Sequence, residues 1–204
     1  MNNPNGLVYV LDDEPGMVRA LTRLLRTVGF EVEGFTLPAG FLKAYRPGLK
    51  SCLVLDVAMP ELGGLDLQKR LTHHGILVPI VFLTGHGDIP TSVRAMKAGA
   101  VDFLTKPVND DDLLRAVRAA LARAAEQRET SALSMRLGLL TPREREVMEH
   151  VVTGKLNKQI AADLGTGEQN IKIHRARVMQ KMEAGSLADL VRIAEKLDIG
   201  RSGG

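Results

Sequence analysis

The stretch Cys52-Leu53-Val54-Leu55-Asp56-Val57-Ala58-Met59-Pro60 ends an apolar run abruptly on a carboxylate. The run 53–55 predicts a short buried strand, and Met59-Pro60 break it. In open α/β sheets the residues at the C-terminal ends of the strands border the ligand site. We therefore predict that Asp56 is chemically modified and that the rest of the chain serves or responds to that event.

Other apolar runs alternate with amphipathic segments in the first part of the chain. Such alternation, strand then helix, predicts a five-stranded parallel sheet that is doubly wound, which is an α/β fold of the flavodoxin-like type. The strand 30–35 alternates apolar with acidic or small residues, so we expect it near a sheet edge. The other expected strands are 7–11, 79–84 and 101–104, besides the one that ends at Asp56.

Polar residues close four of these strands. Right-handed crossovers bring the C-terminal ends of parallel strands to one edge of the sheet, so these residues should converge. Gathered carboxylates repel each other unless a cation joins them, and their oxygens suit Mg²⁺. A carboxylate can also accept a phosphoryl group, whose charge a lysine and a hydroxyl then stabilise. Singly, such residues are helix caps, strand residues or surface charges, and only their conjunction predicts a site. They are Asp12, Asp13, Asp56, Thr84 and Lys106.

Beyond residue 139 the strands stop and helical patterns follow. Thr141-Pro142-Arg143-Glu144 predicts a capping box at a helix start. Asn157 is expected to cap a short helix here, as Asp88 is expected to cap a helix that begins around Pro90. The helix from Asn157, a glycine-containing turn and a helix from Glu168 predict a helix-turn-helix, and all formal charges over 172–181 are positive. We expect domains at 1–125 and 139–204, joined by a linker over 126–138 that either continues the preceding helix or is loose.

Composition limits the possible functions. The 204 residues are 45% hydrophobic and 25% charged, which is ample for a packed core, and the net charge of +3 is too small to prove nucleic-acid binding. No apolar run is long enough to span a membrane, and residues 1–6 lack a signal-peptide pattern. One cysteine suits a reducing compartment. We expect a cytoplasmic protein.

Residues 7–122 resemble the receiver domain of two-component response regulators, and the FixJ group in particular. The resemblance implies that Asp56 accepts a phosphoryl group from a sensor histidine kinase. It also implies a divalent ion, Mg²⁺ or Mn²⁺, held by Asp12, Asp56 and the carbonyl of Ala58, with Asp13 acting through water. The matching motifs are Asp12-Asp13, Asp56 with Met59-Pro60, Thr84-Gly85-His86-Gly87-Asp88, Ala95-Met96-Lys97-Ala98-Gly99-Ala100 and Lys106-Pro107.

The same resemblance assigns a switch to the site. Thr84 and Phe103 match the pair that moves when the phosphoryl group arrives, and Lys106 pairs with that group. The Lys106-Pro107 bond is expected to be cis. For Phe103 plain core packing remains the alternative.

Residues 139–197 resemble the LuxR-type DNA-binding domain through Leu140-Thr141-Pro142-Arg143-Glu144-Arg145-Glu146-Val147, Asn157-Lys158-Gln159-Ile160-Ala161 and Ile171-Lys172-Ile173-His174-Arg175. Gly167 departs from the usual Ser or Thr cap of the recognition helix. Glycine still caps tolerably, so the helix should survive. For His174 and Arg175, interhelical packing is the alternative to DNA contact. The candidate DNA contacts are Lys158, Gln169, Asn170, Lys172, Ile173, His174, Arg175, Arg177 and Lys181.

These resemblances together predict a transcriptional response regulator, and not a turnover enzyme. Phosphorylation should rearrange the face built from residues 89–105, produce a homodimer on promoter DNA and activate transcription by RNA polymerase. A Mg²⁺-dependent aspartyl-phosphate hydrolase is one alternative, but such enzymes of the haloacid dehalogenase type carry Asp-x-Asp on the first strand. A phosphorylation-independent DNA binder is another. For the second domain alone, a protein-interaction module would not explain the cations of its basic helix.

Overall fold

The computed structural model describes residues 6–60, 62–85 and 89–200. The chain divides into two compact units, Met1–Glu126 and Gln127–Gly204. Within the described ranges, no helix is both long and apolar enough to cross a bilayer.

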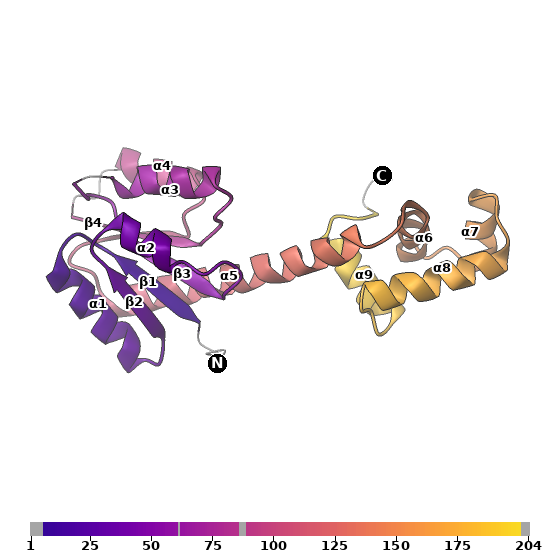
Figure 1. The fold of residues 1–204 in the computed structure, drawn as a ribbon, viewed down its shortest axis with the longest axis horizontal. Coiled ribbons are helices and arrows are strands. Elements are labelled where there is room, and N and C mark those ends of the chain that lie inside the picture. Colours follow the sequence, from indigo (N-terminus) through magenta and orange to yellow (C-terminus); the bar gives the residue numbers. More distant parts are fainter. Residues whose placement is uncertain (1–5, 61, 86–88, 201–204) are drawn as a thin grey trace. The chain divides into compact units, whose positions relative to one another are not determined.

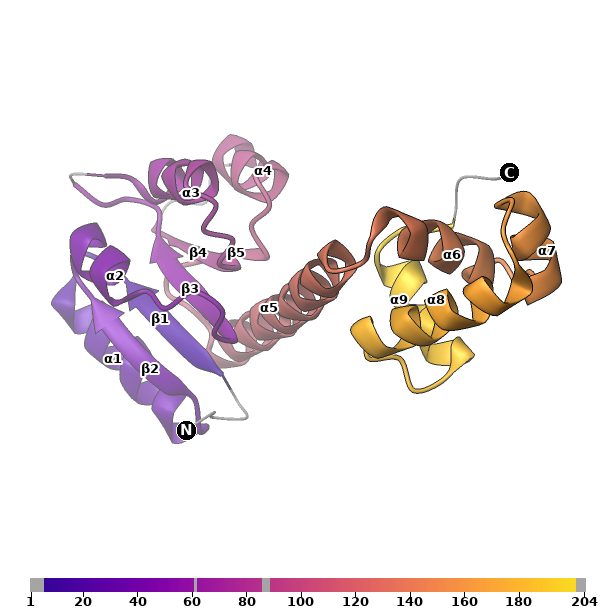
Figure 2. The same ribbon diagram turned by 45° about the vertical axis from the view of Figure 1, so that its right-hand side comes forward.

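The first unit contains a parallel sheet in the strand order β2-β1-β3-β4-β5 (Figure 1, with β5 labelled in Figure 2). This confirms the predicted doubly wound α/β fold and places the strand 31–35 at an edge. The strands are β1 (Leu7–Leu11), β2 (Glu31–Phe35), β3 (Ser51–Asp56), β4 (Ile80–Thr84) and β5 (Asp102–Thr105). The helices are α1 (Pro15–Thr27), α2 (Pro38–Ala44), α3 (Gly64–His73), α4 (Ile89–Lys97) and α5 (Asp110–Gly138).

Alternate side chains of each central strand enter two cores, one on each face of the sheet. Leu53 and Leu55 pack with residues of α2, α3 and α4, while Cys52 and Val54 pack with residues of α1 and α5 (Figure 2). Burial on both faces explains why these strands are continuous apolar runs. It also keeps the sheet rigid beneath the residues at its C-terminal edge.

Helix α5 begins with a side-chain cap. The Oδ1 atom of Asn109 accepts the backbone N–H groups of Asp111 at 2.9 Å and Asp112 at 3.3 Å. The acids of this first turn complement the helix dipole. The helix then continues to Gly138, so the segment that the sequence left open as helical or loose is helical.

The second unit contains α6 (Pro142–Val152), α7 (Asn157–Asp163), α8 (Glu168–Lys181) and α9 (Leu187–Lys196) around one core. The predicted capping box is confirmed: Thr141 Oγ1 accepts the Glu144 N–H, and Glu144 accepts the Thr141 N–H. The cap expected at Asn157 is wrong. Leu156 holds the N-cap position and donates its N–H to Gln159 Oε1 at 2.8 Å.

Gly64 begins α3 where the chain passes very close to the end of β3. A Cβ at this position would lie 2.3 Å from the backbone oxygen of Asp56 and 3.1 Å from the ring of Phe82. A Cβ on the neighbouring Gly63 would lie 3.5 Å from the carbonyl oxygen of Val57, which is an ordinary contact. Only glycine therefore fits at residue 64 without moving the backbone. The cap expected at Asp88, before α4, lies outside the described residues.

We predict that Gly64→Ala lowers the free energy of unfolding of the first unit by roughly 1–3 kcal/mol, because the overpacked contact is with backbone. Both tyrosines, Tyr9 and Tyr45, lie in this unit and the chain has no tryptophan, so tyrosine fluorescence in a urea titration follows it alone. Gly63→Ala is the matched control and should change stability by less than about 0.5 kcal/mol. Equal stabilities of the two variants would contradict the prediction.

Candidate functional site

Two buried carboxylates lie side by side at the C-terminal edge of the sheet. Asp12 follows β1 and is 0% exposed, and Asp56 ends the adjacent strand β3 and is 3% exposed. Backbone donors hold one oxygen of each: the Glu14 N–H reaches Asp12 Oδ1 at 2.9 Å, and the Ala58 N–H reaches Asp56 Oδ2 at 2.7 Å. The second oxygen of each carboxylate is thereby directed to a common point.

The ammonium of Lys106 occupies that point. Its Nζ lies 2.7 Å from Asp12 Oδ2 and 2.8 Å from Asp56 Oδ1. Burial lowers the pKa of Lys106, but its hydrogen bonds with the two carboxylates and their charges outweigh this and raise the pKa above the usual value. Two desolvated acids this close together require a compensating cation, which the lysine supplies.

The lysine reaches this position from the far strand. Lys106 follows β5, and its backbone N–H donates to the carbonyl of Thr84 at 2.7 Å, so the chain turns over the end of β4. The Lys106-Pro107 bond is cis, as expected. The side chains of Asp12 after β1, Asp56 at the end of β3 and Lys106 after β5 thus meet at the C-terminal edge of the sheet.

Thr84 and Phe103 lie beside this cluster on β4 and β5. Thr84 is buried at the last position of β4. Phe103 is half-buried and packs against Phe82, with 6.2 Å between the ring centroids. Its ring lies in the core next to the face formed by α4 and β5, which is compatible with both the switch role and the packing role expected for it.

The structure joins two of the three predicted acids rather than all three. Asp13 is half-buried beside Asp12. Among residues 6–60, 62–85 and 89–200, no three His, Cys, Asp or Glu side chains come together as a metal-binding group. Mg²⁺ needs only one or two carboxylates because it retains several waters. The buried pair Asp12 and Asp56 provides that donor set.

The predicted DNA-contacting residues of the second unit differ in exposure. Three are half-buried, and the others are open to solvent on α7 and α8. The half-buried residues are His174, Arg175 and Lys181. The exposed residues are Lys158, Gln169, Asn170, Lys172, Ile173 and Arg177.

Two of the half-buried cations tie α8 to its neighbours. Arg175 Nη1 donates to Asn157 Oδ1 at 2.7 Å, which explains why Asn157 does not cap α7. Lys181 Nζ donates to Glu144 Oε2 at 2.6 Å and to the Leu139 carbonyl at 3.1 Å. These contacts hold α8 against α7 and the start of α6, and contact of Arg175 and Lys181 with DNA stays a prediction. Nδ1 of His174 is buried and has no hydrogen-bond partner among the described residues.

Glu144 forms a buried ion pair with Lys181 that the sequence did not reveal. Its carboxylate is 2% exposed and accepts from both Lys181 and the Thr141 N–H. The hydrogen bond from Lys181, followed by the one from Thr141, holds the pKa of Glu144 below its usual value. The motif identified Glu144 as a cap, but no sequence signal links it to a lysine 37 residues away.

The two units thus define a receiver-like sheet domain and a helix-turn-helix domain, and comparison with known proteins agrees. Residues 8–118 match the model of the response regulator receiver domain, and residues 138–194 match that of the luxR family of bacterial regulatory proteins. The chain is 50% identical over 197 residues to Nodulation protein W of Bradyrhizobium diazoefficiens, covering 95% of this chain and 87% of that protein. It is 45% identical over 191 residues to the transcriptional regulatory protein FixJ of Azorhizobium caulinodans, covering 92% and 90%.

Solved structures give the same result. The response regulator StyR has a TM-score of 0.71 and 45% identity, with 93% of this chain and 98% of that chain covered. Full-length FixJ from B. japonicum has a TM-score of 0.58 and 42% identity, with 95% and 97% covered. The chain therefore belongs to the response regulators of two-component systems, with a LuxR-type DNA-binding domain, and is a transcriptional regulator.

We predict that Glu144→Gln destabilises the second unit by roughly 1–3 kcal/mol at neutral pH, because Lys181 loses a charged partner. Since folding lowers the pKa of Glu144, its contribution is present above the usual value near 4.5 and is lost as pH falls through the folded pKa. The difference between wild type and variant should therefore shrink in acid. Hydrogen exchange of α6 and α8 over a pH series measures this difference.

The matched control is Glu146→Gln. Glu146 is an exposed residue of the same helix and pairs with Arg143 three residues away. Exposed ion pairs contribute little to stability, so the free energy of unfolding of this variant should differ from that of wild type by less than about 0.5 kcal/mol. If Glu144→Gln behaved in the same way, the ion pair with Lys181 would not hold α8.

Proposed function

We propose that this protein is a cytoplasmic transcription activator that a sensor histidine kinase switches on by phosphorylating Asp56. The observation that supports this most is the position of Lys106 Nζ between two buried carboxylates at the C-terminal edge of the sheet. A phosphoryl group on Asp56 would bring additional negative charge to this cluster, and Lys106 is already in position to pair with it.

In the proposed step an oxygen of Asp56 attacks the phosphorus of a phosphohistidine. The O–P bond to Asp56 forms as the N–P bond breaks, and the leaving imidazole nitrogen keeps the electron pair and takes up a proton. The product is an aspartyl phosphate. Asp56 Oδ1 is the attacking oxygen in this proposal, because its present partner is the side chain of Lys106, whereas Oδ2 is held by the backbone N–H of Ala58.

Asp12 and Asp56 would hold a divalent ion, Mg²⁺ or Mn²⁺, with the carbonyl of Ala58 as a third ligand and Asp13 acting through a water molecule. The ion would supply charge neutralisation for the transferring group. Lys106 now neutralises both carboxylates, and with the ion's charge on the acids its ammonium would be available to pair with the phosphoryl oxygens.

The signal would then pass through Thr84 and Phe103. The hydroxyl of Thr84 would turn toward the phosphoryl oxygens and the ring of Phe103 would occupy the space it leaves. Reversing a two-state population fully takes roughly 5 kcal/mol of differential binding, which new charge-assisted bonds to Thr84 and Lys106 can supply.

The proposed output is a homodimer formed through the face 89–105. On α4, Ile89, Val93 and Met96 expose 76%, 43% and 46% of their surface at helical spacing, which makes an apolar stripe available for burial. A two-fold dimer presents two helix-turn-helix domains to a promoter with two half-sites, where RNA polymerase is recruited. Gln169, Asn170, Lys172 and Ile173 would face base edges, while Lys158 and Arg177 would contact phosphates.

We predict that Asp56→Asn abolishes labelling by radioactive acetyl phosphate in the presence of Mg²⁺, because the amide cannot form an acyl phosphate. Asp66→Asn is the matched control: Asp66 is an exposed aspartate paired with Lys69, and its variant should be labelled like wild type. Chelation of the divalent ion should also suppress labelling. Undiminished labelling of Asp56→Asn would place the acceptor elsewhere.

We predict that Lys158→Ala and Arg177→Ala each weaken binding to a random-sequence 30-base-pair duplex and each reduce the slope of log affinity against log salt by roughly one, because each side chain neutralises a phosphate in the proposed interface. Fluorescence anisotropy over a salt series measures both quantities. Arg192→Ala on α9, which pairs with Asp189, removes the same charge and should leave the slope unchanged. A slope that none of the three variants changes would show that Lys158 and Arg177 do not contact DNA phosphates.

A further inference from the structure

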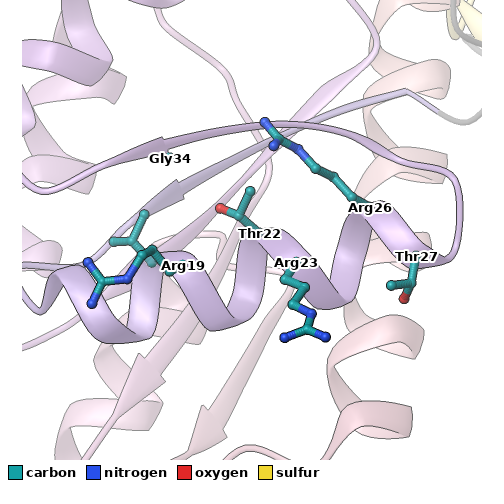
Figure 3. Close-up of a pocket in the computed structure, with 7 residues that line it drawn as sticks. Arg19, Thr22, Arg23, Arg26, Thr27 and Gly34 are labelled. Carbon is teal, nitrogen blue, oxygen red and sulfur yellow. The ribbon is translucent and has the colours of Figure 1, made fainter.

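A cationic groove runs along α1 on the first unit, away from the carboxylate cluster. Arg19, Arg23 and Arg26 lie at helical spacings of four and three residues, which places them on one side of α1. With Thr22 of α1 and Gly34 of β2 they line a groove of about 640 Å³ (Figure 3). None of the residues that line it is acidic.

The charges of this groove are not compensated within the protein. In the part of the chain that the structure describes, neither Arg19 nor Arg23 has a carboxylate within ion-pair distance. Like charges four residues apart destabilise a helix. Arg26 alone has a local reason for its position, since it lies in the last turn, where the helix dipole favours a cation.

The other wall of the groove is the open edge of the sheet. The Glu31 N–H donates to the Gly6 carbonyl and Phe35 accepts from the Asp12 N–H, so these alternate residues of β2 turn toward the neighbouring chain. The residues between them, Val32 and Gly34, must then direct their N–H and C=O groups outward. Arg26 Nη2 donates a hydrogen bond to the Val32 carbonyl at 2.8 Å. The outward N–H and C=O of Gly34 remain beside the groove.

A buried hydroxyl adds a further polar atom at the same place. Thr22 Oγ1 is buried and has no hydrogen-bond partner among the described residues. It faces Gly34, where an added Cβ would lie 3.1 Å from it and 2.5 Å from Val18 Cγ1. Glycine at residue 34 therefore lets α1 pack close to β2 and keeps the edge accessible.

We propose that this groove binds an extended acidic segment of a partner protein. The segment would pair its backbone with β2 at Gly34 and its carboxylates with Arg19 and Arg23. Every second side chain of an extended strand lies about 6.6–6.8 Å apart on one face, and four residues of helix rise about 6 Å, so alternate carboxylates match the two guanidinium groups.

The backbone groups favour a polypeptide over a nucleic acid as the occupant. Guanidinium groups bind carboxylates and phosphates alike, so the arginines do not distinguish the two. The outward carbonyl of Gly34 distinguishes the two occupants. It can accept a hydrogen bond from the N–H of a peptide strand added to the sheet edge, whereas a phosphodiester backbone has no N–H donor.

The test uses the full-length ¹⁵N-labelled protein and a capped peptide of sequence ETETETE. Addition of the peptide should shift the amide resonance of Gly34, and Arg19→Ala with Arg23→Ala should weaken this binding by about tenfold or more. Lys43→Ala with Arg118→Ala removes the same charge from exposed positions of α2 and α5 and should change the affinity by less than about twofold. Methylation of alternate backbone nitrogens of the peptide should also abolish binding.

The remaining outcomes overturn the proposal. Peptide-induced shifts confined to α8 would show that the peptide binds only the DNA-binding domain. Equal affinities of the two double variants would show that the groove arginines are not used. A larger Gly34 shift with a 12-base-pair random duplex than with the peptide at the same salt would make the occupant a nucleic acid.

Discussion

The first domain depends on one electrostatic constraint: two buried carboxylates on adjacent strands share the ammonium of Lys106. Backbone N–H groups fix one oxygen of each acid, so the remaining oxygens must face each other and the cation. Removing the lysine would leave buried charge without compensation, which is far more costly than leaving a surface charge unpaired.

The geometry of the parallel sheet makes this constraint possible. The order β2-β1-β3-β4-β5 places β1 and β3 side by side, and the turn after β5 carries Lys106 over the end of β4. Burial on both faces leaves the C-terminal strand ends as a polar edge of the core, where Asp12, Asp56 and Thr84 lie buried. Gly64 shows how tight this rim is, since the chain passes Asp56 too closely for any side chain. The fold therefore holds the two acids in place at this edge of the sheet.

The second domain uses the same physical device for another purpose. A buried carboxylate, Glu144, caps α6 and binds Lys181 near the end of α8. Arg175 fixes the same helix to α7 through Asn157. Two cations of the basic helix thus fix its orientation within the domain. The other basic residues of the helix, Lys172 and Arg177, are exposed.

The sequence by itself determined the α/β alternation, the helix-turn-helix, the capping box at Thr141 and the edge position of β2, because periodicity, caps and turn residues are local. It also predicted that polar residues at the strand ends converge, and the structure brings Asp12, Asp56 and Lys106 together. Only the tertiary structure decided that Lys106 joins Asp12 to Asp56, that Glu144 binds Lys181, and that Asn157 binds Arg175 instead of capping α7. It alone showed the arginine groove beside Gly34. These are contacts between distant segments, and their partners are chosen by packing, on which a local pattern carries no information.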